Sequence, residues 1–167
     1  MRMSLRLIVS LVAAVTLVSV LFAVYQVNAD DRARRIDLGK RAQVLAESLQ
    51  ETVQPQLAKD DLDDQQRDNL QRILERFGNR ERLAGVAIYD PQGRLVLTTS
   101  NLAAHLGPQL PEVDKAVFRG NGWGKFFEAG KTQMHVYALP VRRGDQIIGA
   151  LAVFHDASYI DAQNVKI

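Results

Sequence analysis

The sequence predicts an α+β protein that is attached to a membrane at its N-terminus, and three observations lead to this prediction. A charge-free apolar run occupies residues 7–25 of the 167-residue chain. Helix-forming residues dominate 30–57, and after Gly78 the apolar spacing changes from a helical period to a period of two. Helices followed by hairpin-connected strands are typical of an α+β domain with an antiparallel sheet.

The apolar run over 7–25 has the length of a membrane-spanning helix. Its 19 residues would form a helix about 28 Å long, close to the hydrocarbon thickness of a bilayer. A cleaved signal peptide is the alternative, because Val27–Ala29 loosely fits the cleavage pattern, but the apolar region of a signal peptide is normally about 7 to 15 residues long. We therefore expect a cytoplasmic tail over 1–6 and an uncleaved signal anchor over 7–27.

The charges beside the membrane segment leave its orientation open. Arg2 and Arg6 precede it, whereas Asp30 and Asp31 follow it, ahead of a largely basic stretch over 32–41. A count of Lys and Arg alone would place the following domain in the cytoplasm, but long domains translocate largely regardless of charge.

The composition excludes several classes of function. Without Arg2 and Arg6, 19 basic side chains balance 19 acidic ones, so the domain lacks the clustered positive charge that nucleic acid binding needs. The absence of Cys excludes thiolate chemistry, and the three histidines show no metal-ligand spacing. No P-loop, dinucleotide-binding motif or nucleophile elbow occurs. We therefore expect no catalysis, no cofactor and no metal in these residues.

A long juxtamembrane helix is expected over 28–59. No Gly or Pro separates Tyr25 from Ile36, so this helix should continue directly from the membrane segment. Its apolar residues follow the spacing of coiled-coil a and d positions: Leu38, Ala42, Leu45 and Leu49. The stripe fits either a helix that packs on its own domain or a helix that pairs with its twin in a homodimer.

A second helix is expected over 62–77. Pro55 indicates a break ahead of it, and Asp60 or Asp61 is a suitable N-cap. Gly78 supplies a C-terminal stop.

Five strands and one further helix are expected after Gly78. The first two strands form a hairpin around the tight-turn sequence Asp90-Pro91-Gln92-Gly93. A short helix over 111–119 precedes three more strands, and the last strand is apolar on both faces, as a central strand is. The expected strands cover 83–89, 94–100, 123–129, 132–141 and 146–155.

Four features carry a resemblance to a known family. They are the strand–turn–strand sequence VAIYDPQGRLVLTTSN, the pair Leu106-Gly107, the short helix that ends at Gly120 and the hairpin sequence ALPVRRGDQIIGALAV. In these the chain resembles the extracytoplasmic single Cache (PAS-like) sensor domains of bacterial receptors and histidine kinases. The resemblance covers about residues 30 to 160 and implies a PAS-like sensor domain over 60–160, with a five-stranded antiparallel sheet and flanking helices.

The resemblance also implies a function and a location. It implies a signal-sensing input domain of a bacterial signal-transduction protein, as in two-component systems, anchored in the inner membrane with the sensor in the periplasm. The family pattern continues into a second membrane helix, a HAMP linker and an output domain, and 161–167 would begin the exit toward that helix. The chain is then either a fragment of such a receptor or a stand-alone tethered sensor, and any enzymatic activity would lie beyond residue 167.

A second resemblance concerns the end of the domain. The sequence FHDASYID, together with the basic N-terminal anchor, is similar to the membrane-sensor region ahead of HAMP linkers in some bacterial trehalose-phosphate synthase-like proteins.

PAS-like domains bind small molecules between the sheet and its covering loops, and the hairpin over 123–141 is the expected liner. A three-residue loop over 128–130 would place Trp123 opposite His135. Five residues would then share one face of the sheet: Trp123, Lys125, Phe127, His135 and Tyr137. Arg119 could add a charge. Aromatic walls, cations and an imidazole suit a carboxylate or another small anion.

Other interpretations of these residues stay open. Aromatic residues on a strand face usually belong to the core. A two-residue loop would change the set of residues on the face, because a one-residue slip reverses the faces of a strand. Arg119 is also typical of a solvated cation at the end of a helix. His105 and His155 are expected to be surface or satisfied structural residues, with pH sensing as the alternative. The alternative function is a membrane-tethered protein-interaction domain without a small ligand, whose long helix would expose its apolar stripe.

Overall fold

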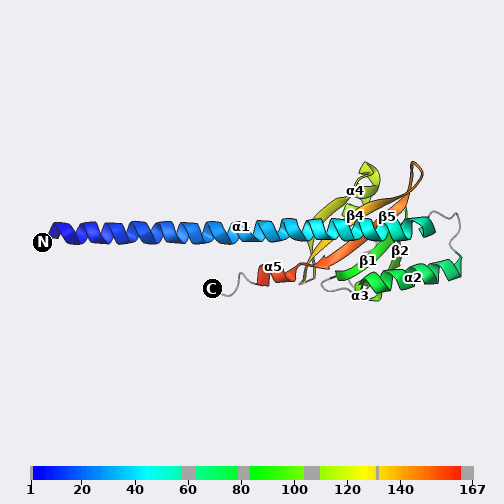
Figure 1. Ribbon diagram of the computed structural model, residues 1–167, viewed down its shortest axis with the longest axis horizontal. Coiled ribbons are helices and arrows are strands. Elements are labelled where there is room, and N and C mark those ends of the chain that lie inside the picture. The colour runs from blue at the N-terminus through cyan, green and yellow to red at the C-terminus, as the bar shows by residue number, and fades with distance from the viewer. Residues whose placement is uncertain (1, 58–62, 79–82, 104–109, 131, 163–167) are drawn as a thin grey trace. The chain divides into compact units, whose positions relative to one another are not determined.

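The structure is a computed structural model that describes residues 2–57, 63–78, 83–103, 110–130 and 132–162. The chain forms two compact units, Met1–Asp37 and Leu38–Ile167. The elements are α1 (Arg2–Leu57), α2 (Asp64–Gly78), β1 (Leu83–Tyr89), β2 (Leu95–Thr98), α3 (Ser100–Ala103), α4 (Pro111–Arg119), β3 (Trp123–Ala129), β4 (Thr132–Arg143), β5 (Gln146–Asp156) and α5 (Ser158–Ala162) (Figure 1).

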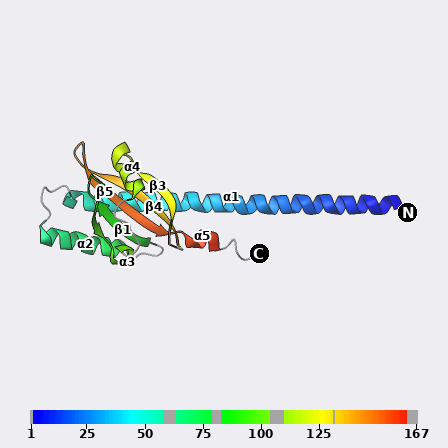
Figure 2. The same cartoon turned by 180° about the vertical axis from the view of Figure 1, so that it is seen from behind.

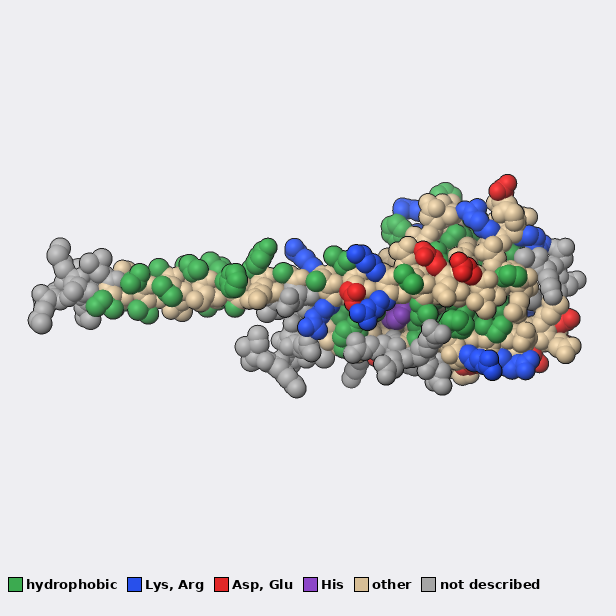
Figure 3. Space-filling model, in the orientation of Figure 1, with side chains coloured by type: hydrophobic (Ala, Val, Ile, Leu, Met, Phe, Trp, Pro, Cys, Tyr) green, Lys and Arg blue, Asp and Glu red, His purple; other side chains and the backbone are tan. Residues whose placement is uncertain are grey.

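The first unit holds the candidate membrane segment. Ile8–Gln26 is helical, 19 residues long and strongly apolar, with a mean hydropathy of 2.5, and none of it is buried. Apolar side chains cover this stretch in the space-filling view (Figure 3). The hydroxyl of Thr16 donates a hydrogen bond of 2.8 Å to the carbonyl of Val12, so this polar group is satisfied within the helix. By length and composition the segment can span a bilayer, and an N-terminal signal sequence shares these properties.

The second unit is built on a five-stranded antiparallel sheet in the order β2-β1-β5-β4-β3. β5 lies between β1 and β4, and residues 149–155 of this strand are buried. The expected central strand is therefore confirmed, as are the five strands and their antiparallel hairpins.

Helices cover both faces of this sheet, which Figures 1 and 2 show from opposite sides. On one face, the buried residues Leu49 and Val53 of α1 and Leu70 of α2 pack with Val86 of β1 and Val153 of β5. We call this the α1 face. On the opposite face, which we call the α4 face, Leu102 of α3 and Val113 of α4 pack with residues such as Val136 and Phe154. Burial of both faces explains why β5 is apolar over residues 147–154.

The stripe on the long helix packs on its own domain. Leu38, Ala42 and Leu49 are buried and Leu45 is half-buried against the core. These four residues therefore do not form the exposed apolar stripe that the protein-interaction alternative expects. Leu38–Leu57 belongs to the compact unit that carries the sheet, because its apolar side chains cover one face of that sheet.

Two details of the helices differ from expectation. Pro55 lies inside α1, which continues to Leu57, because a proline near a helix end removes only one backbone hydrogen bond. The N-cap of α2 is Asp63, whose carboxylate accepts a 2.6 Å hydrogen bond from the backbone N–H of Gln66. Asp60 and Asp61, the expected caps, lie outside the described residues.

Candidate functional site

The register of the β3–β4 hairpin differs from the expected one. Ala129 pairs with Thr132, so the loop has two residues, and Gly130 takes a left-handed φ of 65°. Trp123 therefore lies opposite Ala138, and Lys125 lies opposite Val136. The slip of three residues is odd, so it reverses the face of one strand relative to the other.

This register divides the predicted binding residues between the two faces. Trp123 and Phe127 pack on the α4 face, and Lys125, two residues from each of them along β3, lies on the same face. His135 lies opposite Phe126 and Tyr137 lies opposite Gly124, so both project toward the α1 face. The expectation that all five share one face is wrong.

The α4 face gathers cations around the only tryptophan of the chain. The Arg119 guanidinium lies 4.5 Å from the centre of the Trp123 ring, and the Lys115 ammonium lies 5.5 Å from it. Both distances fit cation–π contacts. Lys125 Nζ lies 3.5 Å from the carboxylate of Glu112, which is buried although its partner is largely exposed. We call Glu112, Lys115, Arg119, Trp123 and Lys125 the Trp123 cluster.

α4 positions three of these residues by ordinary helix geometry. Pro111 begins the helix, where its missing N–H costs nothing. Glu112 follows in the first turn, where a negative charge is favoured, and Lys115 and Arg119 are four residues apart on the same side. Gly120 ends the helix with a φ of 67°, and its carbonyl accepts a 2.8 Å hydrogen bond from Arg142 of β4. Arg119 is thereby held at the end of a helix that is tied to the sheet.

Two buried donors on the α4 face have no hydrogen-bond partner among the described residues. They are the indole N–H of Trp123 and the hydroxyl of Tyr89. Tyr89 is 1% exposed, and burial raises the pKa of its phenol. An unsatisfied buried polar group costs about 1–3 kcal/mol, so an acceptor that reached these donors would be stabilised.

A pocket of about 300 Å³ opens on the same face of the sheet. This volume is at the lower end of the range that small-molecule sites occupy. Apolar side chains and three polar ones line it: Leu83, Ala84, Asn101, Leu102, Thr132, Met134 and Asp156. Leu102 and Met134 also belong to the apolar core of the α4 face.

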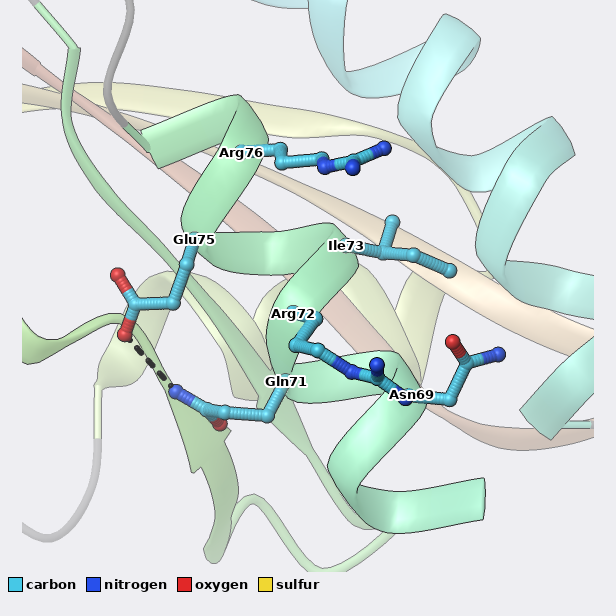
Figure 4. A pocket seen from close by; sticks show the side chains of 6 residues that line it. All are labelled: Asn69, Gln71, Arg72, Ile73, Glu75 and Arg76. Atoms are coloured by element: carbon cyan, nitrogen blue, oxygen red, sulfur yellow. Dashed lines mark hydrogen bonds between the residues drawn. The ribbon is translucent and has the colours of Figure 1, made fainter. Parts of the chain in front are cut away.

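The pocket along α2 is structural in character (Figure 4). Gln71 donates 3.0 Å and 2.8 Å hydrogen bonds to Glu75 and to the carbonyl of Thr98. Glu75 also accepts from the hydroxyl and the N–H of Ser100, and the hydroxyl is the largest influence that lowers the pKa of this carboxylate. These polar groups are satisfied by the protein itself, and they tie α2 to the strand–helix junction after β2.

His155 differs from its predicted role as a surface or satisfied structural residue. His155 is buried, 6% exposed, and its Nδ1 has no partner within the described ranges, so it is neither a surface residue nor a satisfied one. His135 is equally buried beside it. His105 lies outside the described residues.

Sequence reasoning missed Glu112, Lys115 and Tyr89. The i, i+4 spacing of Lys115 and Arg119 could have placed two cations on one side of the short helix. No sequence pattern predicted a binding role for Tyr89, because a tyrosine at the end of an apolar strand is normally a core residue.

No protein-family model matches the sequence, and no curated protein matches it. Many solved structures are similar to this chain, and three sensor domains are described here as examples. The sensor domain of Escherichia coli DcuS gives a TM-score of 0.59 at 20% identity, over 78% of this chain and 96% of that one. The sensory domain of the Campylobacter jejuni chemoreceptor Tlp3 gives 0.64 at 13% identity, over 84% of this chain and 62% of that one. The ligand-binding domain of the Pseudomonas aeruginosa amino acid chemoreceptor PctC, solved with GABA, gives 0.54 at 20% identity, over 74% and 59%.

The chain therefore has the fold of bacterial sensor domains, which confirms the predicted resemblance at the level of fold. It spans nearly the whole of the DcuS domain and about six-tenths of the Tlp3 and PctC domains.

Proposed function

We propose that this chain is the signal-sensing input domain of a membrane-bound bacterial signal-transduction protein, and that it binds a small ligand with a carboxylate on the α4 face of its sheet. The observation that carries the proposal is the Trp123 cluster, in which Lys115 and Arg119 lie over one aromatic ring and Lys125 pairs with Glu112 beside it on the same face of the sheet. The sensor-domain fold supports it, because the similar domains of Tlp3 and PctC were solved with isoleucine and with GABA bound.

The chemistry of the cluster selects the ligand class. A carboxylate accepts strong hydrogen bonds from a guanidinium or an ammonium, and the free indole N–H of Trp123 adds a donor. Glu112 supplies one buried negative charge, which could receive the ammonium group of an amino acid. Amino acids and simple carboxylates are therefore the two ligand types to compare.

The proposed output runs through α1. This helix contains the candidate membrane segment and also the Leu38–Leu57 part that covers the sheet. Ligand occupancy would change how Leu38–Leu57 packs, and the continuous helix would pass that change to the inner membrane from a periplasmic sensor. A homodimer is part of the proposal, and light scattering that shows only monomers in a membrane mimetic would contradict it.

A thermal-shift screen of the full chain in detergent tests the ligand. Amino acids, dicarboxylates and sugars would be compared at matched ionic strength and pH. A ligand at 100 times its dissociation constant adds about 2.7 kcal/mol to the free energy of unfolding. We expect stabilisation by a carboxylate-bearing compound and none by the neutral sugars. Stabilisation by none of the compounds, or by sugars alone, would contradict the proposed ligand class.

A further inference from the structure

Two buried histidines face each other on the α1 face, away from the proposed ligand site. His135 of β4 lies directly opposite His155 of β5 in the antiparallel register. The side chains of such a pair lie about 5 Å apart at their Cβ atoms. They are 4% and 6% exposed, and neither Nδ1 has a hydrogen-bond partner in the part of the chain that the structure describes.

The imidazole of His135 lies between β3 and α1. Its ring centre is 4.5 Å from that of Phe126. A Cβ added at Gly124 of β3 would lie 3.2 Å from its Nε2, and one at Gly39 of α1 would lie 4.0 Å from the same atom. Glycine at these positions leaves room for the ring between the strand and the helix.

The same region joins α1 to α5. Leu38, which adjoins Gly39, packs with the buried residues Ala157 and Ile160, and Phe126 borders this group. The N–H of Ala157 donates a 2.8 Å hydrogen bond to the carbonyl of Gln133, two residues before His135. The histidine pair therefore lies where α1, β3 and α5 meet.

Several titratable groups lie on the elements around the pair, including Asp37, which precedes Leu38 on α1, and Asp156, which follows His155 on β5. Tyr137 follows on β4, Glu128 projects from β3 opposite Gln133, Tyr159 lies on α5, and Lys40 and Arg41 flank Gly39 on α1. Glu128, Lys40 and Arg41 are exposed, and the residue opposite His155 on β1 is the apolar Leu83. Across the described ranges, no carboxylate makes an ion pair or hydrogen bond with either imidazole at Nδ1.

We propose that His135 and His155 form an acid-sensitive latch, which holds Leu38–Ala42 of α1 on the sheet while both imidazoles are neutral and releases it when they become protonated. Protonation would place two like charges side by side in an apolar site, which burial and mutual repulsion both oppose. Release of α1 exposes the imidazoles to water, where the charged forms are stable. The domain would thus respond to acid independently of any ligand.

The direction of the pH effect follows from linkage. Burial lowers the pKa of both histidines to about 4, and for His155 the charge of His135 lowers it further. An exposed histidine has a pKa of about 6.5, so the released state takes up protons first as the pH falls. Docking of α1 is therefore strongest above about pH 6.5 and weakens as the pH falls toward about 4. Over this range the equilibrium constant for docking falls by up to about tenfold per histidine for each pH unit.

Distance measurements between spin labels test the latch in the full chain in lipid nanodiscs. The chain has no native cysteine, so labels can be placed at Val44→Cys on α1 and Asp145→Cys in the β4–β5 turn, both exposed sites. We expect one narrow distance at pH 7.5 and a second, broader population below about pH 6. Replacement of both histidines (His135→Gln with His155→Gln) should remove this pH response, whereas His105→Gln, the matched control, should retain it.

Two results would overturn the latch. One is a distance distribution that stays unchanged down to pH 4.5, and the other is an unaltered pH response in the double glutamine variant. If that variant does not fold, NMR titration of the imidazoles in the His105→Gln protein decides. Titration midpoints of His135 and His155 at a pH well below 6.5, coinciding with the distance change, support the latch. Titration midpoints near pH 6.5 overturn it.

Discussion

Trp123 is the residue on which the proposed site depends. Its ring packs on the α4 face, two cations from one helix lie over it, and its N–H is buried without a partner among the described residues. A tryptophan used only as core would normally have its N–H satisfied, because buried polar groups almost always find a partner. These properties together favour a binding role over a purely structural one.

Arg119 is the cation whose loss should affect binding most. Arg119→Gln removes the charge that lies closest to Trp123, while the helix still ends at Gly120. A hydrogen bond to a charged group contributes about 1.5–3 kcal/mol, so we expect the dissociation constant of the carboxylate ligand to rise about 10- to 100-fold. Isothermal titration calorimetry on the full chain measures this change.

Arg76→Gln is the matched control for that substitution. Arg76 is exposed on α2 and carries the same charge, but it lies on the other side of the sheet from the Trp123 cluster. Equal losses of affinity in the two variants would indicate a general effect of net charge and would argue against a site at Trp123.

At the scale of elements, the apolar stripe of α1 packs on the sheet of its own domain, so the stripe is not free to form a dimer interface. The stripe alone fitted both alternatives, since a helix that packs on a sheet and a helix that pairs with a copy need the same apolar spacing. Only the partner surface distinguishes them, and here it is the α1 face of the sheet.

Leu49→Ala measures how strongly α1 is bound to the sheet. Leu49 is fully buried in the core of the α1 face, so truncation leaves a cavity and should cost about 2–5 kcal/mol of unfolding free energy. Val44 is 65% exposed on the same helix, so Val44→Ala should change the stability by less than about 0.5 kcal/mol. Chemical denaturation monitored by circular dichroism compares the two, and equal effects would refute the packing described for α1.

In the β3–β4 hairpin, the sequence predicted the strands but not their register. The two strands were predicted at nearly their observed bounds, because alternation and glycine punctuation are local signals. The predicted register of the hairpin was wrong. Glu128-Ala129-Gly130 and Gly130-Lys131 are both plausible loops, because Gly130 can take the left-handed conformation in either of them. The slip of three residues, an odd number, then separated His135 and Tyr137 from Trp123.

At the scale of the whole molecule, the sequence was sufficient for the architecture. Helix periods, turn residues and the apolar strand over 146–155 predicted the order of elements and the central position of β5. The candidate site was harder to predict, because Glu112 meets Lys125 and Arg119 meets Trp123 only through contacts between α4 and β3, which local sequence patterns do not encode. The balanced charge of the sequence agrees with the surface, because basic and acidic side chains are interspersed on the face of the sheet-carrying unit that Figure 3 shows.

The emission of Trp123 tests the central claim most directly, because it is the only tryptophan in the chain. A carboxylate ligand from the thermal-shift screen would be titrated into the full chain while the fluorescence is recorded. A ligand at the Trp123 cluster should change the intensity or wavelength saturably, with the midpoint at the calorimetric dissociation constant and a shift to higher concentration in Arg119→Gln. A ligand that stabilises the protein but leaves the emission of Trp123 unchanged would contradict a binding site on this face.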